Sequence, residues 1–316
     1  MKGLGIYQLA VLLSAASLIQ ACAGGGGGEE RSNTAGEVTI SVDETLSPVI
    51  EEELKVFHAD YPEATITPLY VSEQEAIRAL MLDSSKVAIA TRALTPEEEA
   101  QFKKTYQYTP RSIKIAVDAV ALILNKANHD TLLTAEEVRS IFRGEVTRWD
   151  EMDDGNIADE IKIVFDNPYS STISAVKKFA DMERLDSSRM VAAQRNTDVI
   201  SYVEENPNAL GIIGVNWISH PQDSAAQAFL GSINLVGIAP DQGKPGHGQY
   251  YKPYQAYLAQ GYYPISREVF AINAGMNVGL GTGFVSFLAS ERGQLIIFRG
   301  GLLPARQPVR LINIQE

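Results

Sequence analysis

The sequence predicts an α/β protein built on an open, largely parallel sheet. Two observations carry this prediction. Short apolar strands alternate with segments of helical period along most of the chain, in βαβαβα order at its beginning. Polar turns with hydroxyl residues also follow several strands at the point where a helix begins. Both features are typical of parallel strands joined by crossover helices.

The early elements follow from local patterns. Alternating or continuous apolar residues between turn signals predict strands at 36–42, 64–71 and 86–90. Each is followed by a predicted helix. The first has Ser47 as N-cap and Pro48 at its first position, and the third starts at the turn Thr95-Pro96.

The segment 113–125 is long and almost entirely apolar, which indicates a strand buried on both faces that crosses between two lobes. Beyond it, Thr134 is expected to cap a helix, and another helix is expected after the hydroxyl run 170–172. The remaining expected elements are strands at 160–165, 208–218 and 233–239, and one closing helix within 283–304. The stretch 240–263 has no clear period.

Composition limits the function classes. The chain has 316 residues, 45% of them hydrophobic and 21% charged, which suits a globular protein of about two domains. Its formal net charge is -12, which argues against non-specific binding to nucleic acid or to an anionic membrane surface. A bound anion would therefore need a local site made of N–H groups, hydroxyls and a few cations.

The N-terminus predicts export and lipid attachment. Residues 1–21 combine an early cation, a short apolar run and small residues, as secretory signal peptides do. Cys22 is the only cysteine, and the residues before it resemble the lipobox of bacterial lipoproteins, which implies acylation of Cys22. The alternative is a plain signal peptide with an incidental cysteine. Residues 22–36 are Gly-rich and then polar, so we expect a flexible tether. The expected location is the cell envelope, periplasmic or on the cell surface, with contact to the membrane through the lipid anchor only.

Nothing in the sequence predicts catalysis. The four histidines show no metal-ligand spacing, and no phosphate loop or nucleophile elbow is present. We therefore expect a protein that is not an enzyme and has no metal site and no cofactor.

Three strand-to-helix turns, at 41–48, 91–98 and 166–172, carry hydroxyl residues. In an open α/β sheet, ligands bind at the carboxyl ends of strands, against the free N–H groups of helix N-termini. The alternative is that these hydroxyls are only N-caps. The case for a site rests on finding three such turns at corresponding strand ends.

At this level the chain resembles a known family, the PstS-like phosphate-binding proteins of ABC transporters, which have the type 2 periplasmic-binding fold. The resemblance rests on motifs that occur in the family's order: VFHADYPEATIT, KVAIATRALTPEE, IAVDAVALILNKAN, LTAEEVRSIFRGEVTRWDE, NALGIIGVNWI, YPISREVFAIN and FVSFLASERGQLIIFRGGLLP. It implies two α/β lobes, each a mostly parallel sheet flanked by helices, joined by a two-strand hinge around a ligand cleft. The first lobe would comprise residues 37–114 and 263–316, and the second lobe residues 115–262.

The resemblance also implies a set of ligand-binding residues: Glu44, Thr45, Leu46, Ser72, Thr91, Arg92, Ser170, Ser171 and Thr172, with Asp166 and Asn167 in the last loop. Typical family members carry Gly-Ser-Gly-Thr in that loop and an upstream Arg, where this chain has Asp166. Our hypothesis is that Arg92 clamps the oxyanion, and that Asp166 orients Arg92 or accepts a proton from the ligand. The alternative for Arg92 is a surface ion pair with a nearby Glu.

The implied function is that of an extracytoplasmic, lipid-anchored protein that captures inorganic phosphate or a similar small oxyanion for an ABC permease. Two alternatives remain. A surface lipoprotein could use the same fold for interaction or sensing, with a different ligand or none, which the acidic residues Glu44 and 51–53 favour. A hydrolase of phosphoesters is disfavoured, because no activated nucleophile is visible.

Overall fold

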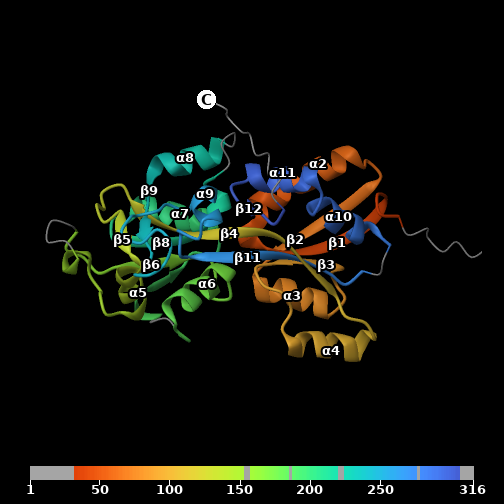
Figure 1. Cartoon of the computed structure of the whole chain (residues 1–316), viewed down its shortest axis with the longest axis horizontal. Helices are drawn as coiled ribbons and strands as arrows, with labels where there is room; N and C mark the ends of the chain where they lie inside the picture. The colour runs from red at the N-terminus through yellow and green to blue at the C-terminus, as the bar shows by residue number, and fades with distance from the viewer. Residues whose placement is uncertain (1–31, 153–156, 185–186, 220–223, 276–277, 307–316) are drawn as a thin grey trace, which may run out of the picture. The chain divides into compact units, whose positions relative to one another are not determined.

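A computed structural model of the protein describes residues 32–152, 157–184, 187–219, 224–275 and 278–306 (Figure 1). The predicted signal peptide, most of the predicted tether and Cys22 lie outside the described residues. From Ser32 onward the chain forms one unit. Within the described ranges, no helix is both long and apolar enough to cross a membrane.

The predicted α/β sheet is confirmed. Its strands lie in the order β2-β1-β3-β11-β4-β8-β6-β7, with β12 and β9 also pairing with β4. Strands β1, β2 and β3 are mutually parallel, as are β6, β7 and β8. The strands are β1 (Gly36–Asp43), β2 (Ala64–Val71), β3 (Val87–Ala90), β4 (Arg111–Asn125), β6 (Lys162–Phe165), β7 (Met190–Ala192), β8 (Ala209–Gly214), β9 (Ile233–Leu235), β11 (Ser266–Asn273) and β12 (Leu303–Pro304).

Two antiparallel strands connect the parallel groups. Strand β4 has 15 residues; its first part pairs with β11 and its last part with β8. Strand β11 in turn pairs with β3. Figure 1 shows β4 and β11 running side by side between the two groups of elements. In their register, Arg267 lies opposite Asp118.

The buried apolar side chains divide along the same line. One cluster is drawn from residues 119–265, and two others are drawn from residues 40–116 and 269–302. The division into two lobes near residues 114 and 263 stays a proposal, and this separation of the cores supports it.

The α-helices begin where the sequence offers caps. Ser72, Thr95 and Thr134 each form a capping box with the glutamate three residues later. The described helices are α2 (Ser47–Asp60), α3 (Glu73–Met81), α4 (Pro96–Tyr106), α5 (Ala135–Arg143), α6 (Ser171–Ala180), α7 (Asn196–Glu205), α8 (Ser224–Ser232), α9 (Gln255–Ala259), α10 (Leu280–Leu288) and α11 (Glu291–Arg299). Short 3₁₀ helices are η2 (Glu44–Leu46), η3 (Trp149–Glu151), η4 (Ser187–Arg189) and η5 (Val215–Trp217).

Some element predictions were wrong in detail. The closing helix is two helices, because the Ser290 hydroxyl accepts from Gly293 N at 3.2 Å and starts α11 as a new helix. Strand 233–239 divides: β9 pairs with β4, whereas β10 (Gly237–Ala239) pairs with β5 (Leu132–Thr134) in a separate sheet. Strand 208–218 ends at Gly214, where η5 begins. Ser47 is not an N-cap, since η2 precedes α2 and places Leu46 in that position.

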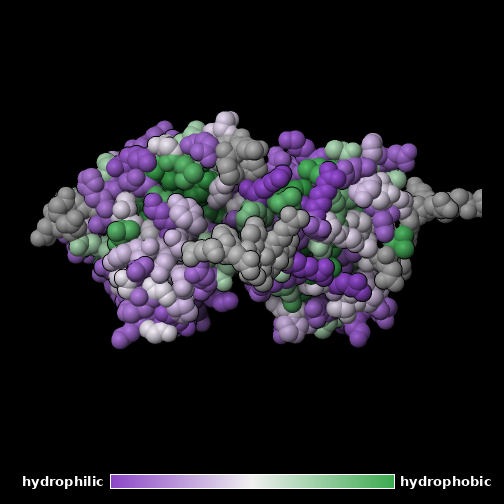
Figure 2. Space-filling model, turned by 45° about the horizontal axis from the view of Figure 1, so that its top comes forward, coloured by the Kyte–Doolittle hydropathy of each residue, from purple (hydrophilic) through white to green (hydrophobic). Residues whose placement is uncertain are grey.

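The face of the molecule drawn in Figure 2 is mostly hydrophilic, with separate hydrophobic patches between the polar side chains. Exposed apolar residues on α11 include Leu295 and Phe298, which are 42% and 53% exposed. Scattered apolar exposure of this kind is ordinary for globular proteins.

Candidate ligand-binding site

The first part of the site lies where β1 ends. Asp43, the last residue of β1, is 1% exposed and accepts a hydrogen bond from Thr45 N at its Oδ1 atom, at 3.1 Å. This contact starts the 3₁₀ turn η2, which holds Glu44, Thr45 and Leu46. The predicted residues Thr45 and Leu46 are fully buried there. Asp43 itself was not predicted.

The second part is the N-terminus of α6, with the predicted hydroxyl run. Ser170 is the N-cap, and its hydroxyl accepts from Thr172 N at 3.1 Å. The Ser170 and Thr172 hydroxyls are 2.7 Å apart, and Thr172 Oγ1 donates to Asp166 Oδ1 at 3.1 Å. Asp166 therefore accepts hydrogen bonds within its own loop, and burial raises its pKa.

The third part is a buried ion pair on the two crossing strands. Arg267 on β11 donates from Nε and Nη2 to Asp118 Oδ2 on β4, at 3.0 and 2.7 Å. Arg267 is 6% exposed and Asp118 is fully buried. Burial lowers the pKa of Arg267, but the charges of Asp118 and Asp43 raise it overall, so the guanidinium stays charged.

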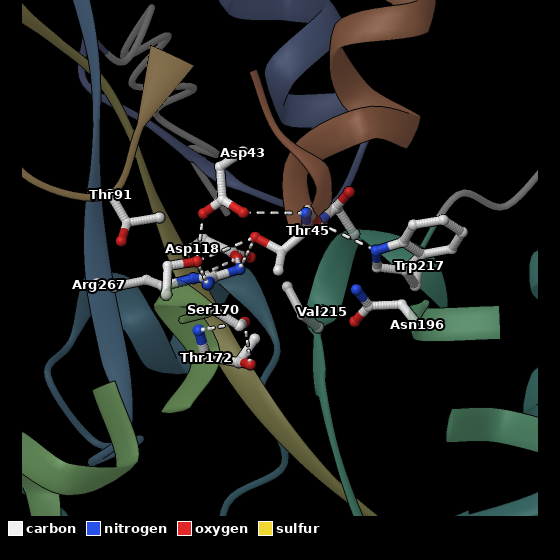
Figure 3. A network of polar contacts seen from close by, with 12 residues as sticks. Asp43, Thr45, Thr91, Asp118, Ser170, Thr172, Asn196, Val215, Trp217 and Arg267 are labelled. Carbon is white, nitrogen blue, oxygen red and sulfur yellow. Dashed lines mark hydrogen bonds and ion pairs between the residues drawn. The ribbon is translucent and has the colours of Figure 1, made fainter. Parts of the chain in front are cut away.

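These three parts meet at the hydroxyl of Ser171. Figure 3 shows Asp43, Thr45 and Arg267 drawn together by this network. The Ser171 hydroxyl donates to Asp43 Oδ2 and accepts from Arg267 Nη1. Its oxygen is also 3.2 Å from Thr45 Oγ1, which accepts from Arg267 Nη2 at 3.0 Å. The turn after β1, the crossing strand β11 and the N-terminus of α6 thus share one buried polar network.

Further contacts join η2 to the elements on the other side of β4. Asn196, the first residue of α7, donates from Nδ2 to Glu44 Oε2 at 2.7 Å. The carbonyl oxygen of Thr45 accepts from Asn216 Nδ2 at 2.8 Å and from Trp217 Nε1 at 3.1 Å. The turn 43–46 is therefore held by residues from α6, α7 and η5.

The network is rich in carboxyl groups. Burial raises the pKa of Asp43 to about 7, against the opposing effect of Arg267. Burial also raises the pKa of Glu44 to about 7, with the charges of Asp166 and Asp43 adding to it. A raised pKa favours the protonated form of each carboxyl, which can donate a hydrogen bond as well as accept one.

The loop at 91–98 is organised differently from our hypothesis. Arg92 donates to both oxygens of Glu98, at 2.7 and 2.9 Å, and to the carbonyl oxygen of Ala93. The predicted pairing of Arg92 with Asp166 is therefore wrong, and the alternative, an ion pair with a nearby Glu, is what the structure has. Glu98 is the partner of Arg92 because it lies only 6 residues further along the chain, in the turn that begins α4.

The other predicted residues lie around the network. Thr91 donates from N and Oγ1 to Glu73 Oε1, at 2.6 and 2.7 Å, and Glu73 is 6% exposed. Ser72 is engaged in its capping box with Glu75. Asn167 accepts from Tyr169 N at its Oδ1 atom, at 2.8 Å, so its side chain stabilises the loop.

Six residues of the network were missed: Asp43, Asp118, Asn196, Asn216, Trp217 and Arg267. A signal was available for one of them, since Asp118 is a charged residue inside an otherwise apolar strand segment. A charge that is buried in a strand needs a partner, which is a reason to look for one.

We expect Arg92→Ala to change ligand affinity by no more than about twofold, because its guanidinium is committed to Glu98. The loss of the surface ion pair should lower the free energy of unfolding by at most about 1 kcal/mol. Isothermal titration with phosphate and chemical denaturation measure the two effects. A tenfold weakening of phosphate binding would instead indicate that Arg92 contacts the ligand.

The arrangement suits the binding of a small anion better than catalysis. Arg267 and two buried hydroxyls converge at the N-terminus of α6, where the helix dipole favours an anion. No group of three or more His, Cys, Asp or Glu residues in the described part of the chain could hold a metal ion. The Ser171 hydroxyl has Asp43 and Arg267 as partners, and neither contact supplies the histidine base that commonly activates a serine.

A separate cavity of about 210 Å³ lies elsewhere, next to η5 and α9. Its lining residues are Val215, Ile218, Ser219, Leu230, Leu235, Pro253, Tyr254, Gln255 and Gly301. None of these side chains is charged. The lining supplies no cation for an oxyanion, so the network around Arg267 is the better candidate.

Comparison with known proteins agrees with this architecture. Residues 27–292 match the family model described as a PBP superfamily domain. The phosphate-binding protein PstS of Staphylococcus haemolyticus is 24% identical over 268 residues, covering 82% of this chain and 78% of the relative. The PstS protein of Pseudomonas aeruginosa is 21% identical and covers 91% of this chain and 89% of the relative.

A solved structure of similar fold is a putative phosphate ABC transporter substrate-binding protein with bound phosphate, from Clostridium perfringens. It aligns with a TM-score of 0.70 and 22% identity, covering 86% of this chain and all of that chain. An ABC-type phosphate transport receptor from Vibrio cholerae aligns with a TM-score of 0.61 and 20% identity, covering 84% of this chain and 99% of that one.

Proposed function

Because the chain belongs to the PBP superfamily, we propose that it is an extracytoplasmic solute-binding protein that captures phosphate for an ABC importer. The observation that carries the proposal is the convergence of Arg267, Thr45 and Ser171 at one buried point. The relatives and the solved structures of similar fold are named as phosphate-binding proteins, which supports the choice of ligand.

Binding would exchange internal contacts for ligand contacts. The oxyanion would accept from Arg267, from the hydroxyls of Thr45 and Ser171, and from N–H groups at the start of α6. Ser171 would then turn from Asp43 to the ligand. Asp43 would accept a hydrogen bond from a protonated phosphate, which is how a carboxylate can serve an anion site.

Closure of two lobes is the second part of the proposal. The turn 43–46 contacts residues of α6, α7 and η5, so separating these contacts would open the site and restoring them would enclose a solute. The closed protein would present a surface that a membrane permease recognises. No covalent chemistry is part of this proposal.

Lipid attachment at Cys22 is also a proposal. We expect the wild-type protein to partition with the membrane fraction and to incorporate a labelled fatty acid. Cys22→Ser should abolish both, and detection of the acyl label in this variant would refute attachment at Cys22.

The carboxyl-rich network favours one competing function, a lipoprotein of the same fold used for interaction or sensing. Asp43 faces the buried guanidinium of Arg267, and Glu44 and Asp166 add two more carboxyl groups to the network, so that together they would repel a fully ionised anion. A titration with phosphate distinguishes the two functions, because the competing function requires no phosphate binding.

The decisive experiment is titration calorimetry with phosphate and sulfate, after unfolding and refolding the protein to remove any carried-over ligand. We expect saturable binding of phosphate. Ser171→Ala should weaken it about tenfold, because it removes a hydroxyl in contact with Arg267. Ser174→Ala is the matched control, since this exposed serine on the same helix bonds only to Ser170 O among the contacts described. Absence of heat with phosphate at millimolar protein would refute the assignment.

A further inference from the structure

We propose that the preferred solute of this cleft carries an ammonium group beside its oxyanion, as an aminoalkyl phosphate or phosphonate does. The inference rests on the proposed oxyanion role of Arg267 and deepens it. It follows from the balance of charge in the network and from the hydrogen-bonding capacity that the network leaves unused.

The charge balance is strongly acidic. Five carboxyl residues belong to the network or contact it: Asp43, Glu44, Glu73, Asp118 and Asp166. Arg267 is the buried cation among them, and Asp118 already neutralises it. At neutral and alkaline pH an inorganic phosphate or an alkyl phosphate adds up to about two negative charges to this surplus, whereas the ammonium of an aminoalkyl phosphate offsets one of them.

The partners of the carboxyls show where a cation is missing. Asp43 accepts hydrogen bonds from Ser171 and from Thr45 N. Asp166 accepts one from Thr172, and Glu44 accepts one from the neutral amide of Asn196. In the described part of the chain, no ion pair includes Glu44 or Asp166. The cation that faces Glu44 electrostatically is Arg195, which is 69% exposed and paired with Asp198. Glu44 and Asp166 therefore lie close together without a buried counter-ion.

An independent observation points to a missing donor at the same place. Asn196 is fully buried, and its Nδ2 atom is used by Glu44, but its Oδ1 atom has no partner among the described residues. Asn216, which is 2% exposed, is in the same situation as Asn196. Its Nδ2 atom donates to Thr45 O, and its Oδ1 atom has no partner among the described residues. Figure 3 shows the amide end of Asn196 pointing toward the network.

A buried acceptor without a partner is unfavourable, so such groups normally receive a donor. An ammonium group supplies three donors and no acceptor, together with the positive charge that Glu44 and Asp166 lack. A hydroxyl would supply a single donor and no charge. The ammonium is therefore the group that satisfies both deficits.

The spacing also suits one small molecule. Glu44, which would face the ammonium, is adjacent in sequence to Thr45, which contacts Arg267. Neighbouring Cα atoms are about 3.8 Å apart, so an arm of two or three carbons is of the right order to join the two positions.

The proposal has a characteristic pH dependence. The groups that face Glu44 are Asp43 and Asp166, Asn196 and the exposed Arg195. At acid pH, protons on Glu44 and its neighbours supply the missing donors, so the ammonium gains little. At alkaline pH these carboxyls are ionised, and the advantage of the ammonium is largest.

The test is titration of the full-length protein with phosphoethanolamine, n-propyl phosphate and inorganic phosphate. Propyl phosphate has the same number of non-hydrogen atoms but no charge on its arm. We expect phosphoethanolamine to bind at least about tenfold more tightly than propyl phosphate at about pH 8.5, and the ratio to shrink toward one at about pH 5.5. This measurement needs no variant.

Glu44→Gln tests whether the ammonium group of the ligand lies beside Glu44. It should reduce the affinity ratio at about pH 8.5 at least fivefold, while propyl phosphate binds as before or more tightly, because the variant removes only a charge. Glu268→Gln is the matched control, since Glu268 is exposed and pairs with Lys114 on the neighbouring strand. This control should leave the ratio unchanged.

The outcomes separate the inference from the proposed function. Two results would refute the preference for an ammonium-bearing solute: equal affinity for the two esters at alkaline pH, or tighter binding of inorganic phosphate than of either ester. Neither result would contradict the proposed capture of phosphate. An affinity ratio that Glu44→Gln does not alter overturns the assigned position. Failure of all three ligands to bind overturns both proposals.

Discussion

Arg267→Met should both destabilise the protein and remove its affinity for oxyanions. The substitution leaves Asp118 fully buried without its counter-ion, and removing one partner of a buried pair typically lowers the free energy of unfolding by about 3–5 kcal/mol. It also removes the cation that contacts Thr45 and Ser171, so we expect phosphate affinity to fall about tenfold to a hundredfold. Chemical denaturation and titration calorimetry measure the two effects.

A second variant separates stability from binding. Arg267→Met combined with Asp118→Leu replaces the buried pair by apolar side chains, which is often neutral or stabilising. We expect this double variant to recover most of the lost stability and none of the lost affinity. Arg292→Met is the control for losing a surface arginine, because Arg292 is 59% exposed and pairs with Asp60. Recovery of binding in the double variant would show that Arg267 only supports the fold.

The elements that could be predicted from the sequence depend on local patterns. Caps such as Thr95 and Ser170, and the alternation of apolar strands with helices, are decided by residues within a few positions of one another. The same locality explains one failure. Arg92 precedes Glu98 by only 6 residues, so a local ion pair determined the partner of Arg92 rather than the more distant Asp166.

The centre of the site could not be predicted because it depends on strand register. Arg267 and Asp118 are 149 residues apart in sequence and become neighbours only when β11 pairs with β4. A shift of one residue would turn each side chain to the opposite face of its strand. Asp118 was visible as a charge inside an apolar segment, but nothing local indicated that it would face Arg267, or that Arg267 would contact Ser171.

Of the residues that the family resemblance implied, Thr45, Ser171 and their neighbours in the two loops lie in the buried network, and their role in binding a ligand stays a proposal. Thr45 and Ser171 are part of the network, whereas the cation comes from a strand to which no binding role had been assigned. Asp166 accepts hydrogen bonds inside its own loop. That Arg267 on β11 supplies the cation in place of the usual arginine at this position is part of our proposal.

Glu53→Met should stabilise the protein, and the gain should increase with pH. Glu53 on α2 is fully buried, and neither of its carboxyl oxygens has a hydrogen-bond partner among the described residues. Burial raises the pKa of Glu53 from 4.5 to about 9. The native protein therefore holds a proton that the unfolded chain releases above about pH 4.5, and folding stability falls as the pH rises from there to about 9.

The coupling between proton binding by Glu53 and folding determines the size and sign of the pH dependence of stability. At about 1.4 kcal/mol per pH unit, the free energy of unfolding of the wild type should lose on the order of 5 kcal/mol between pH 5 and pH 9 through Glu53 alone. Methionine has a similar volume and no charge to bury, so Glu53→Met should remove this slope. Denaturation across that range measures it, with Glu52→Met, whose side chain is 41% exposed, as the neighbouring control. A parallel pH dependence in wild type and Glu53→Met would mean that Glu53 is ionised in the native state and reaches solvent or a counter-ion.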